Sequence, residues 1–104
     1  MNRIERLKDF LLTNPEDSFI QHALALEYIK LGEDEKAKSL FENVLSKNEN
    51  YVGSYYHLAK LLERNDKKEE AIAIYEKGML KSKEANDLHA YNELLAAYED
   101  LIDL

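Results

Sequence analysis

The sequence predicts an all-α fold, a solenoid of antiparallel helix hairpins, and three observations carry that prediction. Apolar residues recur at spacings of three and four along nearly the whole chain of 104 residues, which is the period of amphipathic helices. The chain has only three glycines and one proline, too few for the many tight turns of a β-protein. The third observation is an internal repeat, because residues 18–51 align without a gap on residues 52–85.

Six helices are expected in order along the chain. The first covers about residues 2–12 and has Ile4, Leu7 and Leu11 on its apolar face. We expect Asn14 to cap the second helix at about residues 15–31, with Pro15 in its first turn and Gly32 at its end. The remaining helices are expected at about residues 33–47, 51–64, 67–83 and 86–104, where acidic or polar residues mark the starts.

The residue types at matching positions of the repeat explain how its helices pack. Small residues occupy matching places in both units, where helix backbones must approach closely, and an aromatic residue follows to fill the wedge between neighbouring helices. Because one hairpin cannot bury both of its faces, such units stack into a solenoid. The identical positions are Leu24/Leu58, Ala25/Ala59, Glu35/Glu69, Ala37/Ala71, Glu42/Glu76 and Lys47/Lys81.

This pattern resembles the tetratricopeptide repeat, in which an aromatic-x2-Leu-Gly-x2-Tyr helix precedes an Ala-x3-Phe helix. The resemblance covers about residues 7–85 and departs from the pattern at Gln21, which replaces the aromatic residue, and at Glu49 and Lys83, which replace the final proline. The matching stretches are Gln21-x2-Leu24-Ala25-x2-Tyr28, Ala37-x3-Phe41, Tyr55-x2-Leu58-Ala59-x2-Leu62 and Ala71-x3-Tyr75.

The resemblance divides the single predicted domain into a half repeat at residues 1–14, repeats at 15–50 and 51–85, and a capping helix at 86–104. The last helix fits the pattern only after a two-residue insertion, which puts Leu95 at the position of the small residue. A large residue there fits a terminal helix that admits no further neighbour. Gly78 lies within a predicted helix, and we expect close packing by the last helix to explain it.

Composition excludes several classes of function. The net charge of −7 argues against a nucleic-acid binder, and the absence of cysteine removes disulfides, thiolate metal sites and cysteine nucleophiles. No apolar stretch approaches a membrane span, so we expect no membrane and a cytoplasmic protein. No nucleophile or phosphate-loop motif is present, and His22, His57 and His89 lack metal-ligand spacing, so we expect neither catalysis nor a cofactor or metal.

The resemblance implies a non-catalytic module that binds a peptide or partner protein in a concave groove lined by the first helix of each pair. Some members of the family hold the tail of a chaperone in a clamp of paired lysine and asparagine residues. That ligand is not expected here, because His22 and Leu26 stand at the first pair of clamp positions. Whether the first helix covers Phe19, Leu26 and Ile29 remains open. Of the two adjacent tyrosines, we expect Tyr55 to lie in the core and Tyr56 to lie in the groove. The predicted groove residues are Phe19, His22, Leu26, Ile29, Lys30, Tyr56, Lys60, Glu63, Asn92 and Ala96.

Two alternatives concern the C-terminal end of the chain. Residues 86–104 contain five acidic side chains and no lysine or arginine, which is typical either of a solvated cap or of a surface that attracts a basic segment of a partner. Tyrosine, leucine and isoleucine at an open solenoid end would instead make the protein a self-associating scaffold. The sequence is therefore compatible with a monomer or with a weak homodimer.

Overall fold

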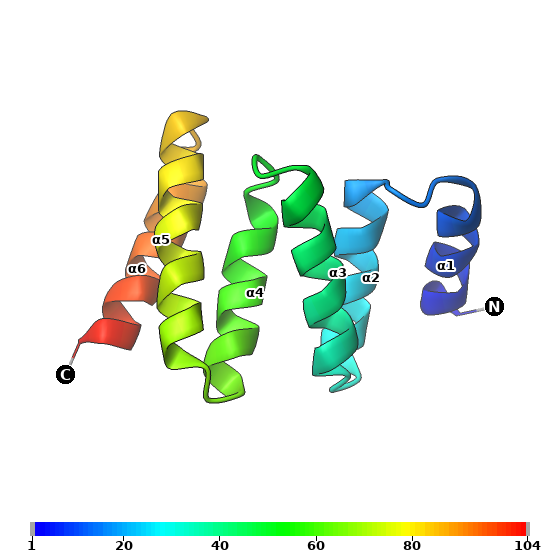
Figure 1. Cartoon of the computed structure of the whole chain (residues 1–104), viewed down its shortest axis with the longest axis horizontal. Helices are drawn as coiled ribbons and strands as arrows, with labels where there is room; N and C mark the ends of the chain where they lie inside the picture. Colours follow the sequence, from blue (N-terminus) through cyan, green and yellow to red (C-terminus); the bar gives the residue numbers. More distant parts are fainter. Residues whose placement is uncertain (1, 104) are drawn as a thin grey trace. The chain divides into compact units, whose positions relative to one another are not determined.

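Six α-helices joined by short turns make up the computed structural model, which describes residues 2–103 (Figure 1). No strand occurs among those residues, and the helices pack as sequential hairpins, so the predicted all-α fold is confirmed. The chain divides into two compact units, Met1–Asn48 and Glu49–Leu104, which are described separately. The helices are α1 (Arg3–Thr13), α2 (Ser18–Lys30), α3 (Asp34–Lys47), α4 (Gly53–Arg64), α5 (Lys68–Glu84) and α6 (Leu88–Ile102).

In the first unit, α2 packs against both α1 and α3. The small residues of the repeat lie where the prediction placed them, since Ala25 and Ala37 have no exposed surface. Phe41 of α3 is also fully buried, and Leu24 of α2 and Leu7 of α1 belong to the same core. Close contact between short side chains on facing helices, with one aromatic residue beside them, is the arrangement that the repeat pattern predicts.

Gln21, which stands at the aromatic position of the repeat, is buried with a hydrogen bond at each end of its amide. Its Nε2 donates to the carbonyl oxygen of Pro15 at 2.7 Å, and Asn43 Nδ2 of α3 donates to its Oε1 at 2.9 Å. A buried amide is tolerated when it is hydrogen-bonded on both sides. Gln21 therefore fastens both the α1–α2 turn and α3 to α2, in place of aromatic packing.

The start of α2 differs from the prediction, and the expectation that Asn14 caps it is wrong. Asn14 ends α1, because its backbone N–H donates to the carbonyl oxygen of Phe10 at 3.0 Å. Asp17 is the residue that caps α2, and its side chain accepts from the N–H of Ile20 at 3.0 Å. The Asp17 N–H donates to the carbonyl oxygen of Asn14 at 3.2 Å, which closes a turn with Pro15 at the second position that proline favours, so the helix begins only after Asp17.

The other helix ends lie within two residues of their predicted places. Gly32 ends α2 as expected and has a φ of 75°, in the left-handed region that favours glycine. Asp66 occupies the corresponding place after α4, 34 residues later, with a φ of 61°. The repeat period therefore extends to the backbone conformation of the turns, although only the first turn uses glycine.

In the second unit, α5 packs against both α4 and α6, and α4 also contacts α6 (Figure 1). Its core contains Tyr55, Leu58 and Ala59 of α4 together with Ala71 and Tyr75 of α5, all of which are buried. Leu94 of α6 is buried as well. The second repeat thus has the same core positions as the first, with a tyrosine where the first has Gln21.

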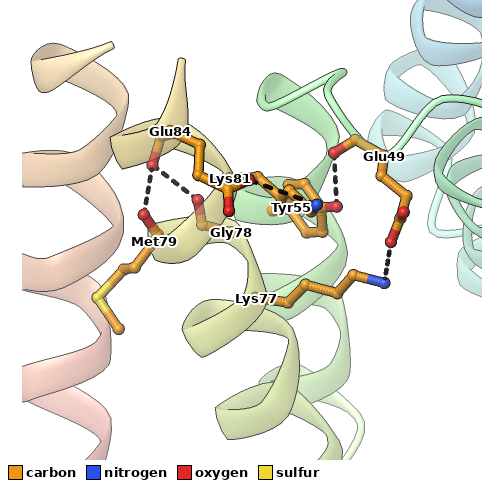
Figure 2. A network of polar contacts seen from close by, with 8 residues as sticks. Glu49, Tyr55, Lys77, Gly78, Met79, Lys81 and Glu84 are labelled. Atoms are coloured by element: carbon orange, nitrogen blue, oxygen red, sulfur yellow. Dashed lines mark hydrogen bonds and ion pairs between the residues drawn. The ribbon is translucent and has the colours of Figure 1, made fainter. Parts of the chain in front are cut away.

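Gly78 marks a close approach between helices in this unit, and its main neighbour differs from the predicted one. A Cβ atom added to Gly78 would lie 2.7 Å from Cβ of Tyr55 and 3.1 Å from Cδ1 of Leu94. The last helix therefore contributes through Leu94, but the tightest contact is with Tyr55 of α4, which faces Gly78 in Figure 2. The sequence could not distinguish these two neighbours because both helices pack on α5.

A polar network holds the start of the second unit to α5 (Figure 2). The Tyr55 hydroxyl donates to the carbonyl oxygen of Glu49 at 2.7 Å, and the carboxylate of Glu49 lies 2.6 Å from Lys77 Nζ. Burial, and next the charge of Glu49, raise the pKa of Tyr55 to about 12. The hydrogen bond from Lys77 lowers the pKa of Glu49. Glu49 replaces the repeat's final proline, and here it anchors the core tyrosine.

Candidate binding surface

The five predicted groove residues of the first unit share one face of α2. Phe19 is 59% exposed, Lys30 is also exposed, and His22, Leu26 and Ile29 are partly exposed. Their spacings of three, four and seven place them along one side of a helix. The opposite side of α2 forms the core, so these residues face outward.

The packing of α1 decides how much of this face it covers. Leu7 of α1 is buried, and Arg3 Nε lies 3.3 Å from the Glu27 carboxylate of α2. Lys8 Nζ lies 5.9 Å from the centre of the Tyr28 ring. Because Phe19 nevertheless keeps more than half of its surface exposed, α1 leaves this aromatic residue open to a partner.

An ion cluster, which consists of Arg3, Glu27 and Lys30, borders the outward face of α2. Lys30 Nζ lies 3.0 Å from Oε2 of Glu27, the same oxygen that Arg3 contacts. The Lys30 hydrogen bond lowers the pKa of Glu27, and the nearby Arg3 charge adds to the effect. Two cations thus share one carboxylate, which leaves the cluster with an excess of one positive charge.

In the second unit, three of the predicted residues are joined on α4. Lys60 Nζ lies 3.8 Å from Oε2 of Glu63 and 5.9 Å from the centre of the Tyr56 ring. Glu63 also accepts a hydrogen bond from the Tyr75 hydroxyl of α5. Burial, and next the bond to Glu63, raise the pKa of Tyr75. Glu63 therefore has a structural partner in the core, which the sequence reasoning missed because no local spacing signals a contact between helices.

The two adjacent tyrosines of α4 differ in burial. Tyr55 is buried in the core, whereas Tyr56 is partly exposed and presents its ring beside Lys60. On α6, Asn92 and Ala96 are both exposed. The predicted groove residues of the second unit are thus accessible on α4 and α6, and Tyr56 is the largest of them.

The three histidines do not form a metal site in the part of the chain that the structure describes. No group of three or more histidine, cysteine, aspartate or glutamate side chains there is placed to hold an ion. His22 packs its ring edge-on to Phe41, with ring centres 5.5 Å apart. His57 makes a similar contact with Tyr56 at 5.5 Å, and His89 is exposed.

His57 is expected to make stability depend on pH near neutrality. Burial lowers its pKa below the ordinary value of 6.5, and the nearby charge of Glu93 opposes that effect. As the pH falls below 6.5, the unfolded chain therefore takes up a proton that the folded chain resists, and the free energy of unfolding falls. We expect the melting temperature to decline from about pH 7 to about pH 5.5, and the variant His57→Gln to show a smaller decline.

The matched control for His57 is His89→Gln, which changes an exposed histidine on α6. This variant should keep the wild-type dependence of melting temperature on pH. Working above about pH 5 keeps the lowered carboxylate pKa values of Glu27 and Glu49 out of the measurement. An unchanged pH dependence in His57→Gln would show that the burial of this ring does not act on stability.

Comparison with known proteins identifies the family. A family model described as "Tetratricopeptide repeat" matches residues 20–51 and 52–79, which together are more than half of the chain. The chain belongs to the tetratricopeptide repeat family. Domains of this family are generally protein-binding modules and are typically non-catalytic. A search of curated proteins finds no match.

Solved structures agree with the family assignment. A tetratricopeptide repeat domain protein from Salinibacter ruber, solved by NMR, is 38% identical, with a TM-score of 0.82 over 86% of this chain and 91% of that chain. A crystal structure of a tetratricopeptide repeat domain protein from the same organism is 36% identical, with a TM-score of 0.80 over 84% and 98%. The TPR2B domain of yeast Sti1, solved as a complex with pHsp70, shares the fold at 18% identity, with a TM-score of 0.87 over 94% and 78%.

No helix among residues 2–103 is both long and apolar enough to cross a membrane.

Proposed function

We propose that this tetratricopeptide repeat protein binds a peptide segment of a partner protein on the outward faces of α2 and α4. The observation that carries the proposal is Phe19, an aromatic residue that the core does not need and that remains 59% exposed on the same face as Leu26. Exposed apolar residues that gather on one face are typical of partner sites. Tyr56 supplies a comparable anchor on α4, since tyrosine is enriched among residues that dominate binding energy.

The charges beside these anchors indicate the chemistry of the peptide. Arg3 and Lys30 share the single carboxylate of Glu27, so the border of the α2 face has an excess of positive charge. A peptide with an apolar side chain near Phe19 and a carboxylate near Lys30 would complement both features. The likeness to a Sti1 domain solved with pHsp70 agrees with peptide binding as the general mode, but it does not identify the partner.

Peptides selected from a random library displayed on phage can test this proposal without a known partner. The dissociation constant of a selected peptide is measured by calorimetry for the wild type and for Phe19→Ala and Tyr56→Ala. We expect each variant to raise the constant by at least about tenfold, because truncated anchor residues cost more than about 1.4 kcal/mol. Lys30→Glu should weaken peptides that carry a carboxylate and reduce the salt dependence of their binding.

Leu12→Ala is the matched control, because Leu12 is 81% exposed on α1 and lies outside the predicted groove residues. Its dissociation constant should equal that of the wild type. Equal binding by wild type, Phe19→Ala and Tyr56→Ala would contradict the proposal and would place the binding surface elsewhere on the protein.

A further inference from the structure

The outer face of α6 lacks the cover that the corresponding faces of α2 and α4 possess. In α2 and α4 the three residues that face the following helix of the hairpin are buried, whereas their counterparts in α6 are only half-buried. Within the residues that the structure describes, the helices that pack on α6 are α5 and α4, and no helix follows α6 as α3 follows α2 and α5 follows α4. The buried sets are Gln21, Ala25, Tyr28 and Tyr55, Ala59, Leu62, and the half-buried set is Tyr91, Leu95, Tyr98.

The uncovered face carries a regular apolar stripe. Leu88, Tyr91, Leu95, Tyr98 and Ile102 follow one another at spacings of three and four, which is the pattern of the seam between two helices in a coiled coil. The ends of the stripe are the most open, since Leu88 is 66% and Ile102 is 41% exposed. Exposed apolar surface that is continuous along a helix is typical of a protein contact.

The neighbouring helix α5 extends this face with charged residues of both signs. The Tyr98 hydroxyl donates to Oε2 of Glu76 at 3.2 Å, and Lys83 Nζ lies 5.5 Å from the centre of the Tyr91 ring. Leu80, which is 55% exposed, lies between Glu76 and Lys83 on the same side of α5, because residues at i, i+4 and i+7 share a helix face. The Tyr98–Glu76 and Lys83–Tyr91 contacts lie on either side of Leu80 on α5 and of Leu95 on α6.

We propose that this face pairs with the same face of a second copy, with the two α6 helices antiparallel. A two-fold interface requires a surface that complements itself. A two-fold axis that crosses α5 at Leu80 and α6 at Leu95 would place Tyr91 of one copy opposite Tyr98 of the other. The same axis would set Glu76 of each copy opposite Lys83 of the other, so that the interface contains two pairs of opposite charge.

The charges favour a second copy over a basic peptide as the occupant. A basic peptide would suit Glu76 and Glu99, but it would also face Lys83. In the antiparallel pair, the acidic C-terminal end of α6, which includes Asp100, approaches the N-terminal end of the other α6. That end carries the positive pole of the helix dipole, which the capping carboxylate of Asp87 partly offsets, and Lys83 lies beside it. The inference is independent of the proposed peptide binding, because it rests on α5 and α6 alone.

Sedimentation equilibrium over a series of protein concentrations tests the pairing. The wild type should pass from monomer to dimer as its concentration rises to about 1 mM. Leu80→Asp, which buries a charge only in the dimer, should raise the dissociation constant of the dimer by at least about tenfold. Leu12→Asp is the matched control, an equally drastic change at an exposed leucine of α1, and it should dimerise as the wild type does.

A charge exchange tests the antiparallel register. Glu76→Lys and Lys83→Glu should each dimerise more weakly than the wild type, because each places like charges opposite one another twice. An equal mixture of the two variants should recover dimers, since both cross-copy pairs are then of opposite charge while the contacts within each chain stay altered. A wild type that remains monomeric throughout, an unaffected dimer in Leu80→Asp, or a mixture that stays monomeric would each overturn the proposal.

Discussion

Replacing Tyr55 with alanine is expected to lower the free energy of unfolding by about 3–5 kcal/mol, the usual cost of truncating a buried aromatic residue. Tyr55 is 1% exposed, packs against Gly78, and donates its hydroxyl to the carbonyl oxygen of Glu49 at 2.7 Å. Tyr56→Ala, one residue further on, should change the same free energy by less than about 1 kcal/mol, because its ring is partly exposed.

Urea denaturation followed by circular dichroism compares the two tyrosine variants directly, and each serves as the control for the other. Both remove the same side chain from the same helix, so helix propensity alone cannot separate them. If Tyr56→Ala proved as destabilising as Tyr55→Ala, the register of α4 would be wrong. The assignment of Tyr56 to the binding surface would then fall with it.

Gly78→Ala is expected to destabilise the protein, although alanine is the better helix former. Helix propensity alone would favour alanine over glycine by up to about 1 kcal/mol. The added methyl group would lie 2.7 Å from Cβ of Tyr55, an atom close to the backbone that cannot move aside without shifting α4. Overpacking of a filled core typically costs about 1–3 kcal/mol, so the contact outweighs the propensity and the net change should be unfavourable.

Gly53→Ala provides the control for this substitution, because Gly53 is exposed at the first position of α4. It should leave the free energy of unfolding within about 0.5 kcal/mol of the wild-type value. The check is again urea denaturation of both variants beside the wild type. A stabilised Gly78→Ala would mean that α4 and α5 do not approach each other as closely as the structure has them.

The helices and the core could be predicted from the sequence because both follow local periodicities. The 3.6-residue period gives the helices, and the 34-residue repeat gives matching core positions such as Ala37 and Ala71. The cap of α2 could not be chosen, because Asn14 and Asp17 have nearly equal capping preference. The deciding factor is the turn that Pro15 imposes, which is a property of the backbone.

Part of the proposed binding surface could also be predicted from the sequence. The outward orientation of Phe19 and Tyr56 follows from helix register, and the structure has both accessible. The contacts that join residues on different helices were missed, namely Arg3 with Glu27 and Tyr75 with Glu63. Such pairs are far apart in the sequence, and their formation depends on the distance between helix axes, which composition and spacing do not specify.

The central claim, that the outward faces of α2 and α4 bind a peptide, is tested most directly by two-dimensional NMR with a selected peptide. The protein is labelled with nitrogen-15 and carbon-13, and signals are followed as the peptide is added. The account predicts saturable shifts at Phe19, Leu26, Tyr56 and Lys60, with no change at Leu88 of α6. Shifts confined to the α6 face, with Phe19 and Tyr56 unchanged, would contradict it.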